Sequence, residues 1–384
     1  MLSTLLSGFM GWLTARTAGP RWRVHLVAAC VLLAVLGQFP AYRHTYETLV
    51  QGATPAADLR NFERQVAHPF QPLTNRPDSH AAKLVFRLTL PLLARWLHLS
   101  VLHVLVAQFA LGVLMYYLLA GLLARTIADR PTATLLLLGL SGTYFGSAFA
   151  YDLGGYFDAF CYALLVLLLV VRSPAAIVAI ALAGGFIDER LLLAAPLVGL
   201  WYGVETYGWQ SARLWPYLLT RRALALYAGA LAYGAVRLTL AHYYHLPTYT
   251  GLVGLDALLD NLHYERLGLG YLFGWKAYWL LLLLAVLLLL HRRAYRLLAL
   301  ALLAAAPIFA GASLITDLTR SLAYGIPALV LAASLLTQAS TLAERRTVAL
   351  TLAVASLLMP SYHVVGQLVF QAPVYHVVLR LLAQ

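Results

Sequence analysis

The segments LLLLLAVLLLL at residues 280–290 and LLLLGLSGTYFGSAFA at residues 135–150 contain no charged side chain. A helix needs about 20 mostly apolar residues to cross a bilayer, and similar segments recur along the whole chain. Hydrophobic residues make up 62% of the 384 residues and charged residues only 11%, with a mean hydropathy of +0.77. These values are far from those of soluble domains. We therefore predict an all-α, polytopic integral membrane helix bundle that forms a single transmembrane domain over residues 1–384.

The apolar segments predict about eleven transmembrane helices, near residues 24–40, 101–123, 132–150, 158–171, 174–187, 191–208, 223–240, 268–290, 297–315, 321–338 and 347–360. Residues 1–23 are predicted to form a cytoplasmic interfacial segment with an amphipathic helix over residues 2–13. Two polar stretches, residues 41–83 and 241–267, are predicted to be outer loops. In the first loop, the spacing of the apolar residues predicts an interfacial helix near residues 55–66.

Charge is distributed unevenly between alternate loops. With the N-terminus in the cytoplasm, the inner loops carry fourteen basic residues and three acids, and the outer side carries thirteen basic residues and twelve acids. This pattern follows the positive-inside rule and predicts a bacterial inner-membrane protein whose active face is periplasmic. The net charge of +12 then reflects topology and anionic lipid head groups. We expect the lipid bilayer, and no nucleic acid, as a partner.

The first outer loop holds one group of candidate site residues. At 100° per residue, Asp58 and Glu63 point about 140° apart on a helix, so one carboxylate can face a cavity while the other faces water. The same loop supplies cations that suit a phosphate-bearing substrate, namely Arg60, Arg76, His80 and Lys83. An ordinary solvated loop is the alternative interpretation.

Other charged residues lie at the ends of apolar segments. Asp152 and Asp158 flank a turn with two glycines, although Asp158 is also placed to cap the following helix. Asp188, Glu189 and Arg190 are consecutive charges between apolar segments, which is costly unless they pair or face a polar cavity. The alternatives are a structural ion-pair cluster and a functional site.

A further group contains Asp317, Arg320 and Tyr324, again between apolar segments. Asp317 and Arg320 are three residues apart and can neutralise each other on a helix. Arg320 can also present its guanidinium to a phosphate. Carboxylates deprotonate hydroxyl groups, and cations stabilise phosphate leaving groups. The outer groups together predict glycosyl transfer from a lipid-phosphate sugar.

These considerations assign a role to each residue. The candidate catalytic carboxylates are Asp58, Glu63, Asp188 and Glu189. The candidate substrate-binding residues are Arg60, Arg76, His80, Lys83, Asp152, Asp158, Arg190, Asp317, Arg320 and Tyr324. Cys30 and Cys161 both lie in apolar segments and indicate no disulfide or metal framework, so no residue is assigned to a metal.

The order of these features resembles the GT-C superfamily of polytopic membrane glycosyltransferases. Over roughly the first two-thirds of the chain, both have an N-in first span, a long outer loop with an acidic residue, and a short acidic outer turn. The resemblance implies a polyprenyl-phosphate-linked sugar as donor and a catalytic carboxylate in the first outer loop. Asp58 is the best match, with Glu47, Glu63 and Asp78 as rivals. Arg320 would be the counterpart of a late basic residue that binds lipid phosphate.

The chain also departs from this pattern. The first loop has no adjacent acids and no D-x-D motif, so a divalent metal is possible but not indicated, and the cofactor stays unassigned. No large soluble domain follows the last predicted span. The sequence identifies neither the acceptor nor any protein partner.

Other classes of membrane protein compete with a glycosyltransferase. A transporter or flippase would show inverted repeats and charges near the midplane, whereas this chain shows no repeat and collects its charges on one side. An O-antigen-type polymerase or ligase would use outer-loop Arg and His residues. A membrane acyltransferase would need an embedded base, for which His363 or His242 is available. A purely structural protein would gain nothing from charges such as those at 188–190.

Overall fold

The computed structural model describes residues 2–37, 57–209, 214–247, 249–250, 253–364, 368–371, 379 and 382. The first half contains α1 (Leu2–Ala18), α2 (Trp22–Gly37), α4 (Ala57–Ala67), α5 (His80–Leu84), α6 (Thr89–Trp96), α7 (Val101–Ile127), α8 (Arg130–Ser141), α9 (Tyr144–Tyr151), α10 (Asp158–Val170) and α11 (Pro174–Gly185). The second half contains α12 (Arg190–Leu193), α13 (Ala195–Tyr207), α14 (Trp215–Leu218), α15 (Arg221–Tyr243), α16 (Leu255–His263), α17 (Arg266–Trp275), α18 (Tyr278–His291), α19 (Tyr295–Ser313), α20 (Leu318–Leu322), η1 (Ala323–Gly325), α21 (Ile326–Ala339) and α22 (Leu342–Leu358). Two short strands, β1 (Ser361–Val364) and β2 (Leu368–Gln371), pair antiparallel near the end.

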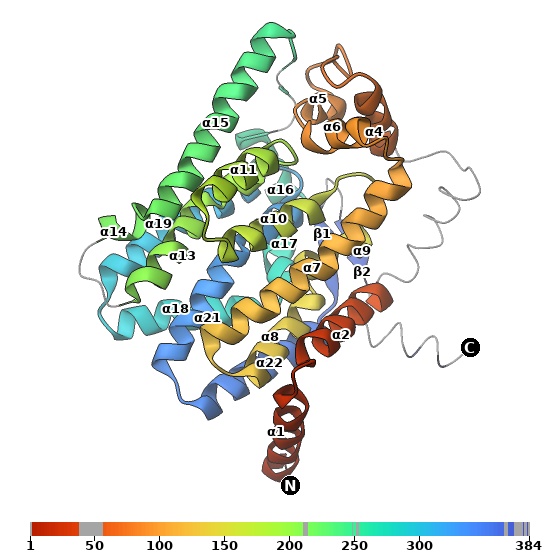
Figure 1. Ribbon diagram of the computed structural model, residues 1–384. Helices are drawn as coiled ribbons and strands as arrows, with labels where there is room; N and C mark the ends of the chain where they lie inside the picture. Colours follow the sequence, from red (N-terminus) through yellow and green to blue (C-terminus); the bar gives the residue numbers. More distant parts are fainter. Residues whose placement is uncertain are drawn as a thin grey trace.

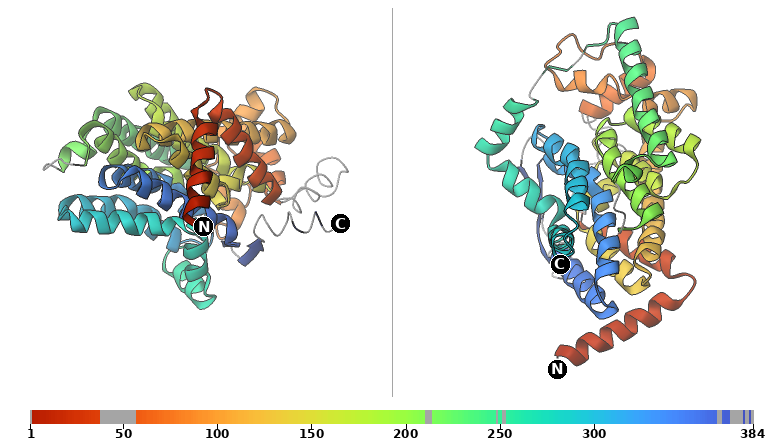
Figure 2. Two further views of the ribbon diagram at one scale, coloured as in Figure 1. Left: turned by 90° about the horizontal axis from the view of Figure 1, so that it is seen from below. Right: turned by 90° about the vertical axis from the view of Figure 1, so that its left-hand side faces the viewer.

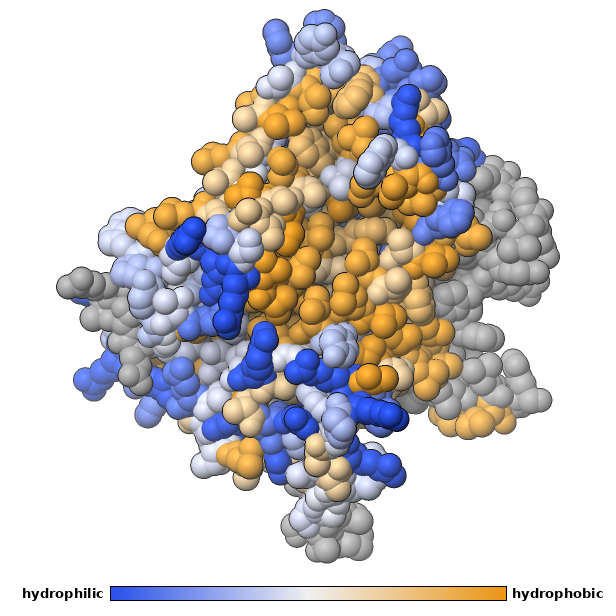
Figure 3. All heavy atoms as spheres, in the orientation of Figure 1, coloured by the Kyte–Doolittle hydropathy of each residue, from blue (hydrophilic) through white to orange (hydrophobic). Residues whose placement is uncertain are grey.

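The apolar helices indicate a membrane protein. Among the residues that the structure describes, four helical segments are long and apolar enough to cross a bilayer: α7, α15, α19 and the stretch Leu318–Ala339. Three bent pairs, α1 with α2, α8 with α9 and α17 with α18, raise the number to as many as seven if each pair is one span. Figure 3 shows a broad apolar surface across the middle of one face, with hydrophilic residues gathered towards its two ends.

The all-α prediction is confirmed, and each of the eleven predicted segments contains a helix. The count of about eleven crossings is not confirmed. The segments near 158–171 and 174–187 form α10 and α11, of 13 and 12 residues, which are shorter than the roughly 20 residues of a full crossing. The segment 268–290 is split, because α17 and α18 meet at 84°. Lys276 lies at this bend with a φ of +51°.

The N-terminal segment forms a longer helix than predicted. α1 extends to Ala18 and turns by 116° into α2. Figures 1 and 2 show α1 projecting from the lower end of the bundle. Arg130 at the start of α8 donates to the carbonyls of Thr17 (3.1 Å) and Ala18 (2.9 Å). This contact supplies partners for two carbonyl groups at the C-terminus of α1 that have no partner within the helix.

Side chains that accept backbone hydrogen bonds define several helix starts. Asp129 accepts from the backbone N–H of Thr132 at the start of α8. Thr341 and Glu344 form a reciprocal capping box at the start of α22, in which each side chain accepts the backbone N–H of the other. Asp129 also pairs with Arg346 at 2.8 Å. The first turns of α8 and α22 are therefore held together at one end of the bundle.

The described core centres on α10. Its residues Cys161, Tyr162, Leu165 and Leu169 are fully buried, and α7, α9, α11 and α13 pack around it. The phenol of Tyr162 donates to the carbonyl of Arg320 at 2.8 Å. The start of α10 is thus held directly against α20, which brings together segments that are far apart in the sequence.

Two helices approach closely at Gly229. α11 and α15 lie side by side (Figure 1), and a Cβ at Gly229 would lie 2.7 Å from the Cβ of Ala181 and 2.9 Å from the carbonyl oxygen of Val178. Small residues at membrane helix interfaces permit such contacts. Gly234, on the same helix, has no atom within 4 Å of the corresponding position.

We expect Gly229→Ala to lower the thermal unfolding temperature of the purified protein, because overpacking costs about 1–3 kcal/mol. Gly234→Ala is the matched control and should leave the temperature unchanged or raise it, since Ala favours a helix over Gly by about 0.5–1 kcal/mol. Equal effects of the two substitutions would contradict the close packing of α11 against α15.

Candidate functional site

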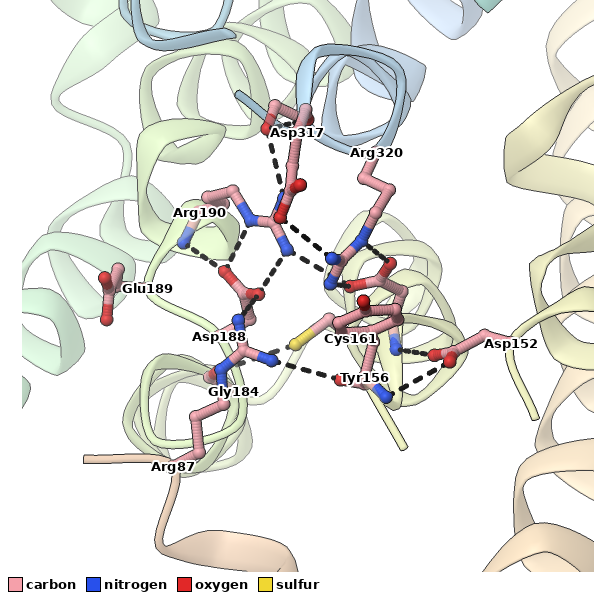
Figure 4. A network of polar contacts seen from close by, with 12 residues as sticks. Arg87, Asp152, Tyr156, Cys161, Gly184, Asp188, Glu189, Arg190, Asp317 and Arg320 are labelled. Carbon is pink, nitrogen blue, oxygen red and sulfur yellow. Dashed lines mark hydrogen bonds and ion pairs between the residues drawn. The ribbon is translucent and has the colours of Figure 1, made fainter. Parts of the chain in front are cut away.

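Buried and half-buried aspartate and arginine side chains form a continuous network between α9, α10, α12 and α20 (Figure 4). Each member is joined by a hydrogen bond to the side chain or the backbone of another member. The members are Arg87, Asp152, Asp158, Asp188, Arg190, Asp317 and Arg320. The network therefore combines three of the groups that the sequence predicts. It also contains Arg87, which sequence reasoning did not select.

Asp158 is the centre of the network. It is the first residue of α10 and is fully buried. Its carboxylate accepts from Nε and Nη2 of Arg320 at 2.6 and 2.9 Å, and from Nη2 of Arg190 at 3.2 Å. The phenol of Tyr144 adds a fourth bond at 2.9 Å. One carboxylate thus connects α9, α10, α12 and α20, and it lies at the positive end of a helix dipole.

Asp188 joins the network to Arg87. It accepts from the backbone N–H and Nε of Arg190 at 3.0 and 2.8 Å, and from Nη2 of Arg87 at 2.9 Å. Burial raises the pKa of Asp188, but Arg190 and Arg87 outweigh this effect and hold the pKa well below its usual value. Asp188 thus accepts hydrogen bonds from two guanidinium groups, which favour its charged form.

Arg320 is enclosed by network partners. Besides its two bonds to Asp158, it donates from Nη1 to Asp317 at 2.9 Å. The ring of Tyr156 covers the guanidinium at 3.9 Å, a cation–π contact. The side chain is only 1% exposed. Arg320 thus holds other groups in place, and a phosphate could reach it only by displacing an aspartate.

Arg190 and Tyr324 are two further predicted site residues, and they lie next to each other in this cluster. Arg190 donates to Oγ of Ser321 at 3.0 Å, and its guanidinium lies 5.3 Å from the centre of the Tyr324 ring. Both residues are buried. The structure therefore places both residues among network partners, away from the surface of the described residues.

Asp152 forms no ion pair within the described residues. Its two carboxylate oxygens accept the backbone N–H groups of Tyr156 at 3.1 Å and Asp158 at 3.0 Å, which fixes the turn between α9 and α10. Burial and the nearby charge of Asp158 raise the pKa of Asp152 to about 7. Protonation of Asp152 leaves the three other aspartates of the network balanced by its three arginines.

A small cleft lies beside the network, between α4 and the turn at residues 152–157. Asp58, Phe62, Arg87, Gly155 and Tyr156 contribute to its walls. Its volume is about 20 Å³, which is enough for about one water molecule. Asp58 is half-buried, and the Arg87 side chain is 22% exposed. A carboxylate and a guanidinium therefore line one cleft at the surface of the network.

Local structure brings α4 against this turn. Leu59 and Phe62 are buried on one face of α4, and Phe62 packs edge-on against Phe157 at 4.9 Å. Gly155 has a φ of +102°, and a Cβ there would lie 3.0 Å from Leu59. The turn therefore needs glycine both for its backbone and for the close approach of α4.

Arg87 links the cleft to the buried network. It bonds to Asp188 and also donates from Nη1 to the carbonyl of Tyr156 at 3.3 Å. It precedes the apolar residues of α6 by two positions. A cation at the border of an apolar segment is a sequence signal, but its partner Asp188 is 101 residues away and cannot be deduced from spacing.

Several predicted site residues lie apart from the network. Glu189 is 55% exposed and pairs with Arg237 at 2.9 Å, and Figure 4 shows it separated from the cluster. Arg60 and Glu63 are exposed on α4. The helix prediction of about 140° between Asp58 and Glu63 agrees with one side chain lining the cleft and the other facing outward.

The remaining first-loop residues occupy the periphery. Arg76 and Asp78 form an exposed ion pair at 3.0 Å. Lys83 lies 4.3 Å from the centre of the Tyr249 ring. His80 begins α5, but its side chain lies outside the described part of the structure, as does all of Glu47.

His363 is a second residue close to the network. It lies on β1, is 1% exposed, stacks on Tyr151 at 4.7 Å and lies 5.1 Å from the ring of Tyr144. Tyr144 in turn donates to Asp158. The sequence placed His363 only in an alternative, because no local pattern connects it with Asp158.

Within the described residues, no group of three or more His, Cys, Asp or Glu side chains is arranged to hold a metal ion. No protein-family model, curated protein or solved structure matches this chain.

We expect Asp158→Asn to destabilise the protein strongly, because breaking a buried ion pair leaves uncompensated charge and costs about 3–5 kcal/mol. The measurement is thermal unfolding in detergent. Asp78→Asn provides a matched control, since it removes the same charge from an exposed pair and should not shift the unfolding temperature. If both variants unfold at the same temperature as the wild type, Asp158 does not hold the network together.

Proposed function

We propose that the protein is a membrane glycosyltransferase of GT-C-like type. It would move a sugar from a polyprenyl-phosphate donor to an acceptor on the outer face of the membrane. The observation that carries the proposal is that Asp58 and Arg87 both line one cleft, at the edge of a bundle of apolar helices. A base and a phosphate-binding cation within one cleft are the two groups that such a transfer requires.

Each group has a defined part in the proposed reaction. An oxygen of the acceptor hydroxyl bonds to the anomeric carbon of the sugar while the bond from that carbon to the phosphate oxygen breaks. Asp58 takes the hydroxyl proton, and the phosphate leaves with the electron pair of the broken bond. Arg87 stabilises the negative charge that develops on the phosphate.

The buried network positions Arg87 in this proposal. Asp188 and the carbonyl of Tyr156 hold the guanidinium by separate bonds, which limits its freedom before substrate binds. Asp158 and Arg320 hold the turn that carries Tyr156. Arg87 therefore takes the phosphate-binding role that the family resemblance assigned to Arg320, because Arg320 is enclosed by Asp158 and Asp317.

The proposal includes about eleven crossings and a cytoplasmic N-terminus in a bacterial inner membrane. In its support, α4 to α6 lie at one end of the bundle and α1 at the other (Figure 1). Arg130 and Arg346 are also at the α1 end, bonded to α1 and Asp129 respectively. The cleft would then open towards the periplasm.

A transporter or flippase is the second candidate, and the broken helices favour it. Lys276 lies buried at the bend between α17 and α18 and donates to the carbonyls of Ser356 at 3.3 Å and Met359 at 3.1 Å. Charges at helix breaks are typical of secondary transporters. A transporter would move a lipid-linked solute without forming a glycosidic bond.

We expect Asp58→Asn to reduce sugar transfer from a polyprenyl-phosphate donor by at least about 100-fold, the usual contribution of a general base. The assay follows labelled sugar from donor to acceptor in vesicles with purified protein. Glu63→Gln, on the exposed side of the same helix, should retain activity. Full activity of Asp58→Asn would refute the role of Asp58, and solute movement without transfer would favour the transporter.

Topology is tested by introducing single cysteines. Asn75→Cys should react with a membrane-impermeant thiol reagent added outside intact spheroplasts, and Ala343→Cys should react only after lysis. Both positions are exposed: Asn75 lies between α4 and α5 at one end of the bundle, and Ala343 lies in the first turn of α22, which Arg346 and Asp129 hold at the α1 end. The native Cys30 and Cys161 are buried and give a low background. The reverse labelling pattern would overturn the proposed orientation.

A further inference from the structure

An apolar groove lies between α13, α18, α19 and α21, which Figure 1 shows close to one another. Its volume is about 430 Å³, and all its lining side chains are Leu, Ala, Val, Phe or Trp. The residues of α21 that line it are Ala328, Leu331, Ala332 and Leu335. Their spacing places them on a single helix face. Faces of α18, α19 and α21, together with Leu197 of α13, are thus turned towards a space that the described residues do not fill.

Water is not a suitable occupant of this groove. The polar atoms in its lining side chains are the indole nitrogens of Trp209 and Trp279, which donate to Ser334 and to the carbonyl of Tyr271. A buried water needs two to four polar partners, and apolar cavities stay dry. An engineered apolar cavity of roughly 150 Å³ binds benzene, so a groove of about 430 Å³ has room for a longer hydrocarbon.

The bilayer is the natural source of that hydrocarbon. α19 and the stretch Leu318–Ala339 are both long and apolar enough to cross a membrane, so the groove between them lies at the level of the acyl chains. An unfilled groove would forgo the dispersion contacts of its lining atoms. A lipid chain supplies those contacts without the need for any polar partner.

One end of the groove adjoins a basic turn. Leu289 and Leu298 line the groove. Between them, Arg292 and Arg293 lie in the turn after α18, and Arg296 lies in the first turn of α19. Leu289 precedes Arg292 by three residues, or about 4.5 Å along a helix. The turn therefore lies within reach of a head group whose chain enters the groove.

The three arginines differ in their contacts. Arg292 donates to the carbonyl of Gln338 at the end of α21, at 2.8 Å. Arg293 and Arg296 are exposed, and neither pairs with a carboxylate in the part of the chain that the structure describes. Basic residues at a membrane surface attract anionic lipid head groups.

We propose that this groove binds one acyl chain of an anionic membrane phospholipid, with the phosphate of its head group at Arg293 and Arg296. The site is separate from the Asp58–Arg87 cleft, and the proposal does not depend on glycosyl transfer.

The test uses the full chain reconstituted in nanodiscs with equal amounts of phosphatidylglycerol and phosphatidylcholine. Lipid that stays bound after release into detergent is identified by native mass spectrometry. We expect the wild type to retain one phosphatidylglycerol in preference to phosphatidylcholine, by roughly thirtyfold given two arginines at the head group. Equal retention of the two lipids, or retention of neither, would overturn the proposal.

Two pairs of variants separate the groove from the basic turn. Ala301→Phe fills the groove and should abolish lipid retention, whereas Ala299→Phe, an exposed position on the same helix, should not. The double variant Arg293→Gln/Arg296→Gln should lose the preference for phosphatidylglycerol, and Arg125→Gln, an exposed arginine of α7, should keep it.

Thermal unfolding of each variant shows whether it is folded. If Ala301→Phe does not fold, the double arginine variant alone decides the outcome. If that variant retains lipid and prefers phosphatidylglycerol as the wild type does, the result contradicts binding at Arg293 and Arg296.

Discussion

The four hydrogen bonds to the carboxylate of Asp158 are the interaction on which the rest of the site depends. A charge buried among apolar helices is tolerated only when partners compensate it, and Asp158 is fully buried. Its partners Arg190, Arg320 and Tyr144 come from three other helices. Those helices can pack around α10 only in an arrangement that brings all four groups together.

This constraint extends outward to the cleft. Arg320 supports the ring of Tyr156, Asp152 fixes the backbone of the same turn, and Asp188 holds Arg87. The turn and Arg87 form one wall of the cleft, and α4 forms the other. Arg87, the surface cation of the proposed reaction, is thus held by buried ion pairs. Its side chain is already ordered before a substrate binds.

Apolar periodicity and length were sufficient to predict the long apolar helices, because burial in hydrocarbon demands internally bonded backbone. They did not predict α5, α6 or α16, the last of which lies in a stretch predicted to be an outer loop. The bends were not predictable in the same way. The sequence 268–290 is apolar throughout apart from Lys276, yet the chain turns there by 84°. The lysine side chain at this bend bonds to the carbonyls of Ser356 and Met359 at the end of α22. Such a contact depends on the tertiary approach of a distant helix.

The same distinction applies to the site. The cost of isolated charges between apolar segments was the reason to select Asp152, Asp188 and Asp317, and the structure places these three residues in one network. It did not separate Asp188 from its neighbour Glu189, which faces α15 and pairs with Arg237. Nor did it reveal which arginine meets which aspartate, since Arg320 and Asp158 are 162 residues apart.

The most direct test of the account is an experimental structure of the protein in a lipid nanodisc with a polyprenyl phosphate bound. The account predicts that phosphate oxygens lie within hydrogen-bonding distance of the Arg87 guanidinium, next to Asp58, while Arg320 stays bonded to Asp158. A phosphate bound far from Arg87, or one that separates Arg320 from Asp158, would contradict it.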